Sequence, residues 1–191
     1  MPSCIPLHST CCKQISGHAK QRAMSFLALL KADEATLIRQ AKRLTKKRQS
    51  LARQVFTEDV DGWTPIHACA LRGSKTLLKI LLCAGIDVNT KMGQPEGLPD
   101  GCAAIHLAAV RGDWNVIKVL LEKGADINAK DTCGRTPVTY AAYRKHRRIV
   151  RLLQEHGADM SMCEYPANYK ETDNCTECIT PQQGNMKFCF F

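Results

Sequence analysis

The stretch DGWTPIHACALRGS at residues 61–74 recurs twice further along this chain of 191 residues. DGCAAIHLAAVRGD follows at 100–113, and CGRTPVTYAAYRKH follows at 133–146. The second and third copies start 33 residues apart, whereas the first and second start 39 apart, so the first interval carries six extra residues. A pattern that recurs at a fixed interval belongs to the architecture of a protein before it belongs to any chemical site.

Each copy predicts two short helices joined by a tight turn. In the first copy Thr64 is expected at the N-cap and Pro65 in the first turn, where its missing N–H costs no hydrogen bond. A second helix carries an apolar run, LLKILL at 77–82, and ends before a glycine. One such pair is too small to bury its apolar faces, so neighbouring units must stack.

The motifs TPIHACA, LLKILLCAGIDVN and VIKVLLEKGADINAKD resemble those of the ankyrin-repeat family over about residues 59–161. The resemblance implies an all-α solenoid of three helix-turn-helix repeats with projecting hairpin loops and a concave binding face. We divide the chain into a disordered Cys-containing tail (1–23), a basic amphipathic helical cap (24–58), repeat 1 (59–91), a hairpin-loop insertion (92–97), repeat 2 (98–130), a degenerate repeat 3 that caps the C-terminal end (131–161), and a disordered tail (162–191).

Both ends of the stack are expected to be closed by atypical segments. A capping helix is predicted before the repeats, because five apolar residues fall on one helical face: Leu37, Ala41, Leu44, Leu51 and Val55. Repeat 3 departs from the pattern at Thr139, Gln154 and Lys145, which replace His, Leu and Gly. Lys145 is expected to share the left-handed backbone of the glycines that it replaces, and therefore to be strained or frayed.

The eleven cysteines do not suggest a disulfide framework. Cys69 falls where the other repeats have Ala108 and Ala141, so it is expected to be a small core residue. We find no secretion signal and no apolar run long enough to span a membrane, and we expect a cytoplasmic or nuclear location, or both. Whether the single CxxC at 175–178 binds a metal stays open, and so does the interpretation that the chain is a truncated isoform.

No catalytic, cofactor or metal site is predicted. His67 and Cys69 are close in sequence, but a zinc site needs three or four converging ligands, and this spacing supplies none. His67 and His106 occupy the histidine of the family motif, and the resemblance implies that they brace adjacent repeats by hydrogen bonds. Phosphate loops, nucleophile elbows and kinase signatures are absent from the sequence, so we expect neither an enzyme nor a small-molecule substrate.

The expected activity is binding of another protein, as an adaptor, scaffold or inhibitor. The resemblance implies that the end of each inner helix and the residue after the first glycine face the concave groove: Trp63, Leu71, Arg72, Val110, Arg111, Arg135, Tyr143 and Arg144. A ladder of apolar and guanidinium groups suits a partner segment that joins carboxylates to apolar anchors. The six-residue insertion is either a binding loop or a tolerated extension.

A competing hypothesis uses the positive charge in front of the repeats. The chain has a net charge of +9, and the cluster KRLTKKR holds Lys42, Arg43, Lys46, Lys47 and Arg48. This cluster is either a nuclear-import signal or the solvated face of the capping helix. The alternative function is a basic nuclear protein that contacts nucleic acid or chromatin through residues 39–53, which would show steep salt dependence.

Overall fold

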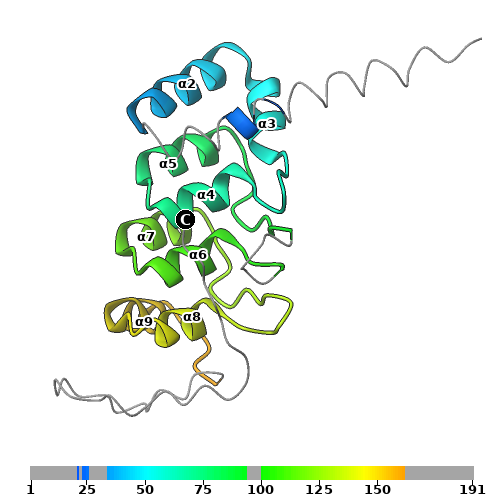
Figure 1. Ribbon diagram of the computed structural model, residues 1–191. Helices are drawn as coiled ribbons and strands as arrows, with labels where there is room; N and C mark the ends of the chain where they lie inside the picture. Colours follow the sequence, from blue (N-terminus) through cyan, green and yellow to red (C-terminus); the bar gives the residue numbers. More distant parts are fainter. Residues whose placement is uncertain (1–20, 22, 26–33, 94–99, 162–191) are drawn as a thin grey trace, which may run out of the picture.

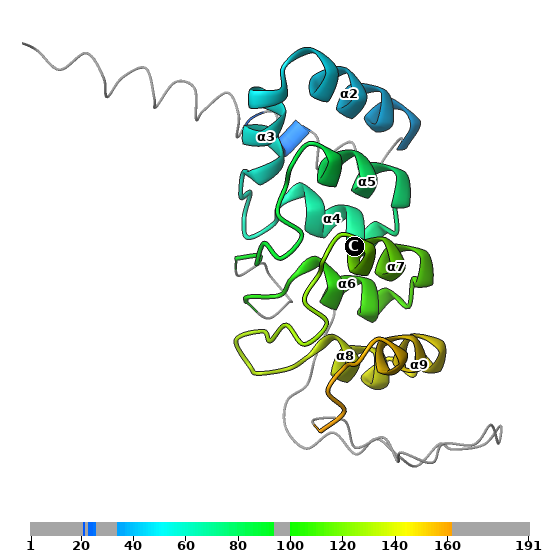
Figure 2. The ribbon, with the colours of Figure 1, turned by 180° about the vertical axis from the view of Figure 1, so that it is seen from behind.

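The computed structural model describes residues 21, 23–25, 34–93 and 100–161. These residues form pairs of helices that stack in chain order, and the loops between pairs project to one side (Figures 1 and 2). The helices are α2 (Glu34–Lys47), α3 (Gln49–Thr57), α4 (Pro65–Arg72), α5 (Lys75–Cys83), α6 (Ala104–Arg111), α7 (Trp114–Glu122), α8 (Pro137–Tyr143) and α9 (Arg147–Glu155). The predicted all-α ankyrin solenoid is confirmed, while nearly all of the two predicted tails lies outside the described residues.

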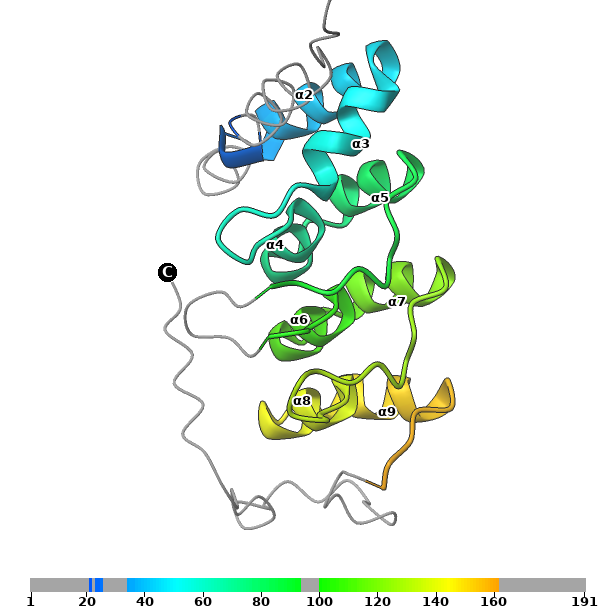
Figure 3. The ribbon, with the colours of Figure 1, turned by 90° about the vertical axis from the view of Figure 1, so that its right-hand side faces the viewer.

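The repeats form two layers of helices (Figure 3). Helices α4, α6 and α8 stack directly on one another as the inner layer, and α5, α7 and α9 form the outer layer. The core lies between the layers and between successive repeats, where the apolar runs of the sequence are buried: Leu77, Leu78 and Leu81 in repeat 1, Val116, Ile117 and Leu120 in repeat 2, and Ile149, Leu152 and Leu153 in repeat 3. Burial between repeats is the dominant stabilising contribution in such a stack.

The N-terminal cap is a pair of helices, which corrects the expectation of a single capping helix. The break falls at Arg48, whose φ of −147° and ψ of 69° are not helical. Neither Gly nor Pro is present there, so packing rather than local propensity explains the break: α2 lies against α5, while α3 lies against α4. Arg53 fixes this arrangement, because its Nε donates to the Ala84 carbonyl at the end of α5 at 3.0 Å.

Asparagine side chains tie each repeat to the next on the outer side of the stack. The Asn89 Oδ1 accepts a hydrogen bond from the Asp126 backbone N–H at 2.8 Å, and the Asn128 Oδ1 accepts from the Asp159 N–H at 2.7 Å. These bonds span 37 and 31 residues of sequence, so they satisfy backbone donors of a loop that has no strand partner. The GIDVN and GADIN motifs therefore set the stacking distance between repeats.

The turn within each helix pair needs a left-handed residue. Gly73 and Gly112 have φ of 84° and 77°, and Lys145 takes the same conformation in repeat 3 with φ of 59°. The residue after each of them donates to the carbonyl five positions earlier, as His146 N does to Ala141 O at 2.9 Å. The expected strain at Lys145 is confirmed, but the turn is regular rather than frayed, because these hydrogen bonds do not require glycine.

Replacing Lys145 by Gly should stabilise the protein by up to ~1 kcal/mol, because glycine adopts positive φ without the Cβ penalty. Chemical denaturation of the full chain measures this difference. Lys123→Gly is the matched control, since Lys123 has φ of −98° and glycine there should destabilise. A lower free energy of unfolding for Lys145→Gly would contradict the strain.

The six extra residues enlarge the hairpin between repeats 1 and 2. Met92 N donates to Cys102 O at 2.9 Å, and Gly101 N donates to Met92 O at 3.2 Å. The hairpin of repeat 3 has the same two bonds between Asp131, Gly134 and Arg135. Met92 is 2 % exposed, so it belongs to the base of the hairpin, and the inserted length lies beyond it.

Deletion of residues 94–99 should therefore leave a hairpin of the same length as that of repeat 3. The melting temperature should be preserved, because the entropy of closing a loop changes little with its length. Thermal unfolding followed by circular dichroism tests the fold. A collapse of the transition would show that the inserted residues are structural, and a loss of partner binding in a folded variant would identify them as a binding loop.

Candidate protein-binding surface

Two buried histidines brace the repeats, as the sequence predicts. The His67 Nε2 lies 3.0 Å from the Thr90 carbonyl oxygen, and its Nδ1 lies 2.6 Å from the Thr64 hydroxyl oxygen. A ring nitrogen that faces a carbonyl must donate, so Nε2 carries the proton and Nδ1 accepts from Thr64. Thr64 is at the N-cap position as predicted, although its hydroxyl bonds to the imidazole rather than to the helix backbone.

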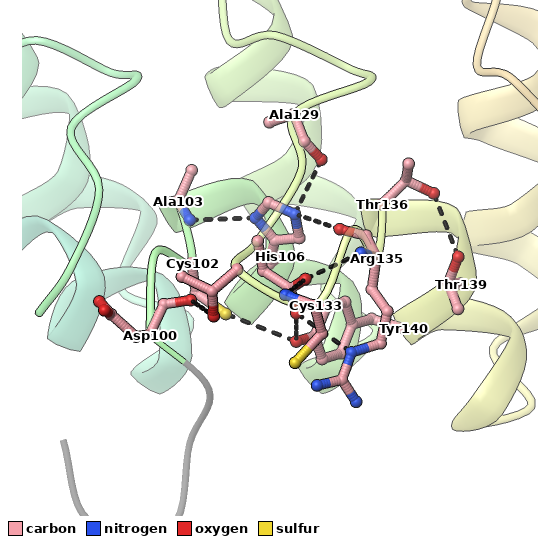
Figure 4. Close-up of polar contacts among 12 residues, drawn as sticks. Asp100, Cys102, Ala103, His106, Ala129, Cys133, Arg135, Thr136, Thr139 and Tyr140 are labelled. Carbon is pink, nitrogen blue, oxygen red and sulfur yellow. Dashed lines mark hydrogen bonds and ion pairs between the residues drawn. The ribbon is translucent and has the colours of Figure 1, made fainter. Parts of the chain in front are cut away.

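His106 repeats this geometry one unit later. Its Nδ1 accepts from the Ala103 N–H at 3.0 Å, and its Nε2 donates to the Ala129 carbonyl at 2.9 Å, with the Arg135 carbonyl at 3.3 Å (Figure 4). Both imidazoles are fully buried, and burial lowers their pKa because it disfavours the charged ring. For His67 the pKa falls to about 4. The two histidines are therefore neutral structural groups.

A polar network holds the hairpin of repeat 3 (residues 131–135) to repeat 2 (Figure 4). The buried Asp131 carboxylate accepts from the Arg135 N–H at 2.8 Å, from the Arg135 Nε at 3.2 Å and from the Tyr140 hydroxyl at 2.5 Å. The Tyr140 ring packs edge-on against His106 with centroids 5.5 Å apart. The Tyr140 hydroxyl oxygen also lies 3.5 Å from the Cys102 sulfur. Burial raises the pKa of the Cys102 thiol to about 11 and raises the pKa of Tyr140 as well, so neither group ionises at neutral pH.

The predicted contact residues do not form one open ladder. Val110 is 2 % exposed, because it belongs to the central inner helix, which has α4 on one side and α8 on the other; its assignment as a contact residue is wrong. Arg135 faces Asp131, so its guanidinium belongs to the hairpin. The remaining side chains are partly buried or exposed at the surface: Trp63, Leu71, Arg72, Arg111, Tyr143 and Arg144.

The turns within the helix pairs meet along one edge of the solenoid, which we call the turn edge (residues 72–75, 111–114 and 144–147). Arg111 Nη1 donates to the Leu71 carbonyl at 3.1 Å, and Arg111 Nε lies 3.9 Å from the Asp113 carboxylate. In the next repeat the His146 Nε2 donates to the Val110 carbonyl at 2.9 Å. The second and third turns thus cap the inner helix of the preceding repeat, so Arg111 has a structural role although its side chain is exposed.

The basic cluster lies on the outer surface of the cap. Lys42, Arg43, Lys46 and Lys47 are exposed on α2, and Arg48 is exposed at the break before α3. The apolar residues of the same segment face α5 instead, as Leu37 and Ala41 are fully buried. The cluster lies on a solvated face of the cap, which was one of its two expected roles, whereas its use for nuclear import stays a prediction.

The described part of the chain contains no group of three or more His, Cys, Asp or Glu side chains that would suit a metal ion. Cys69 is fully buried, and burial raises its pKa, as expected of a core residue. None of the described helices combines the length and the apolarity that crossing a bilayer requires. The CxxC at 175–178 lies outside the described residues.

Sequence reasoning missed two features. The Asp131 network follows from the last residue of the motif GADINAKD, whose carboxylate could have been assigned to the hairpin that comes directly after it. Trp114 is 42 % exposed at the first position of α7, next to the Asp113 N-cap. The sequence did contain a signal for this exposed tryptophan. The other two repeats carry the charged residues Lys75 and Arg147 at the position directly after the turn, which indicates that this position faces solvent.

The His67 imidazole should make stability depend on acid. Its folded pKa of about 4 lies below the value of about 6.5 expected in the unfolded chain, so the unfolded state binds the proton first. The free energy of unfolding should therefore fall as the pH falls from 6.5 to 4, by on the order of 3 kcal/mol. Urea denaturation at several pH values checks this, and His67→Gln should be less stable at pH 7 but show a smaller loss on acidification. An equal loss in both proteins would assign the acid sensitivity to other groups.

Comparison with known families agrees with this geometry. The family model described as "Ankyrin repeat" matches residues 61–92, and the model described as "Ankyrin repeats (3 copies)" matches residues 92–162. A search of curated proteins gives no significant match. Ankyrin repeats are generally protein–protein interaction modules. Two adjoining matches cover more than half of the chain and coincide with the helix pairs α4–α5, α6–α7 and α8–α9, and this chain belongs to the ankyrin-repeat family.

Proposed function

We propose that this chain is a non-enzymatic adaptor, scaffold or inhibitor that binds an acidic and apolar segment of a partner protein. The inner-helix ends supply the surface, with Leu71 and Arg72 in repeat 1 and Tyr143 and Arg144 in repeat 3. The observation that carries the proposal is Arg72, which is partly exposed and has no hydrogen-bond partner among the described residues. An arginine held on a rigid helix end is well placed to pair with a carboxylate.

The rigidity of this surface favours binding. The inner helices stack on one another, and the buried histidines fix the loops that follow them. A surface that is already ordered loses little entropy on binding, so a few half-buried apolar and arginine side chains can contribute most of the binding energy. Arg111 contributes positive charge at the middle of this surface, although it also holds the Leu71 carbonyl.

The proposed sites of action are the cytoplasm, the nucleus or both, with Lys42, Arg43, Lys46, Lys47 and Arg48 as the proposed import signal. The exposure of these five cations on the cap supports that assignment. The alternative function, contact with nucleic acid or chromatin through residues 39–53, uses the same cations. It predicts that affinity falls steeply with salt and is lost on substitution of Lys46 and Lys47.

Arg72→Glu should abolish or strongly weaken partner binding, because it replaces a charge-assisted contact by repulsion. We expect a loss of at least about tenfold, which corresponds to about 1.4 kcal/mol. A photo-crosslinking residue at Tyr143 of the full chain first captures the partner, and calorimetry with the purified pair then measures the affinity. The melting temperature should be unchanged, since Arg72 holds no described backbone group.

Lys118→Glu is the matched control, because Lys118 is exposed on the outer helix α7 and should leave affinity unaltered. Equal affinity of Arg72→Glu and the natural chain would refute the inner-helix surface. Loss of binding confined to a Lys46→Glu and Lys47→Glu variant would favour the basic cap instead.

A further inference from the structure

The turn edge carries two parallel rows of side chains that repeat from one helix pair to the next. The last residue before the left-handed turn is Arg72, Arg111 and Arg144 in successive repeats, and the first residue of the outer helix is Lys75, Trp114 and Arg147. Neighbouring repeats are in contact at this edge, because Arg111 reaches the Leu71 carbonyl and His146 reaches the Val110 carbonyl. The edge is therefore a continuous surface rather than three separate turns.

The charge of this edge is almost entirely positive. Lys145 adds a sixth cation to the two rows, and Asp113 is the one carboxylate that the edge contains. The Asp113 Oδ1 accepts from the Asn115 and Val116 N–H groups at 3.0 and 3.1 Å, and its Oδ2 faces Arg111. That carboxylate is therefore occupied within its own repeat, and the edge holds six cations for one carboxylate.

Trp114 lies in the middle of these cations and is 42 % exposed. Among the described residues it and Met24 are the large hydrophobic side chains that are exposed. A tryptophan surrounded by arginine and lysine is the usual composition of a binding hot spot, whereas an exposed tryptophan without a partner loses hydrophobic free energy. The edge thus fits an extended acidic segment that also carries apolar or aromatic side chains.

We propose that residues 164–177 of this same chain, EYPANYKETDNCTE, occupy the turn edge. This segment carries Glu164, Glu171, Asp173 and Glu177 against a single Lys170, and it adds Tyr165 and Tyr169. Its carboxylates complement the two rows of cations, and its tyrosines provide aromatic partners for Trp114. The assignment does not depend on the proposed partner protein.

The length of the chain permits this contact. The described residues end at Ser161, after α9 has run about 13 Å away from the turn edge. The far end of the edge, in repeat 1, lies two repeats away from repeat 3, and this adds about 16–20 Å to the distance that the segment must cover. An extended chain covers about 3.3 Å per residue, so Glu171 reaches about 33 Å from Ser161 and Glu177 reaches further.

Tethering favours occupancy even if each ion pair is weak. Exposed pairs contribute little one by one, but a segment joined to its own site by a short linker has an effective concentration on the order of millimolar. An acidic partner that uses Arg72, Arg111 or Arg144 would have to displace the segment. The tail would then set a threshold for partner binding.

Zero-length carbodiimide cross-linking of the full chain at low salt tests the contact, since it joins carboxylates to lysines that touch them. We expect intramolecular links from Glu171, Asp173 or Glu177 to Lys75 and Lys145, with a strong decrease at high salt because the charges are exposed. Lys118 and Lys123 are the matched controls, as both are exposed on or beside the outer helix α7. Links to the controls as frequent as those to the edge, or links only in a dimer band, would overturn the proposal.

A second measurement uses Trp114 itself. Acrylamide quenching of tryptophan fluorescence in the full chain, corrected with a Trp114→Phe variant for the contribution of Trp63, reports how accessible the indole is. Neutralising the segment with Glu171→Gln, Asp173→Asn and Glu177→Gln should increase the quenching constant of Trp114 about twofold, and these substitutions leave the sequence of the repeats unchanged. An unchanged quenching constant of Trp114 in the neutralised variant would overturn the proposal. The proposal would also fail if Trp114 were protected from acrylamide only after a single-stranded oligonucleotide was added.

Discussion

The stacking of one helix pair on the next is the constraint on which this structure depends, and the buried imidazoles of His67 and His106 secure it. Each ring joins the start of an inner helix to the backbone of the loop that leads into the next repeat. The described residues of these loops have no strand partner apart from isolated bridges, so these bonds satisfy carbonyl groups that would otherwise be buried without partners. The same bonds require neutral imidazoles, which couples the integrity of the stack to pH.

Because every repeat depends on its neighbours, the two ends need different solutions. At the N-terminal end two helices cover repeat 1, with Leu37 and Phe56 buried and Arg53 holding the end of α5. At the other end α9 keeps Ile149 and Leu153 in the core, while Gln154 is exposed where repeat 1 buries Leu82. Polar outer positions of this kind let a three-repeat stack end in water.

The two edges of the solenoid differ in how their polar residues are used. At the hairpin edge the Asp131 carboxylate pairs with Arg135 and Tyr140, so these groups rigidify the loop and leave little capacity for a partner. At the turn edge Arg111 and His146 each cap the inner helix of the preceding repeat through one side-chain nitrogen. The Arg111 side chain is nevertheless exposed. The turn edge is therefore a rigid surface rich in cations, and this charge is the basis of both proposals made above.

The sequence by itself determined the fold family and the left-handed position of Lys145. These follow from local rules, namely a period of 33 residues with an apolar face and a turn that only one backbone conformation can make. The bracing role of His67 and His106 was implied by the resemblance to the ankyrin-repeat family, and the structure shows the bonds. Only the tertiary structure decided which side chains are available for binding. Val110 and Arg111 are adjacent in sequence, yet the first is buried between α4 and α8 and the second caps α4, because exposure and pairing depend on atoms from repeats about 35 to 40 residues away. The break at Arg48 has the same origin, since α2 and α3 pack against two different helices and no residue in the segment signals the change of direction.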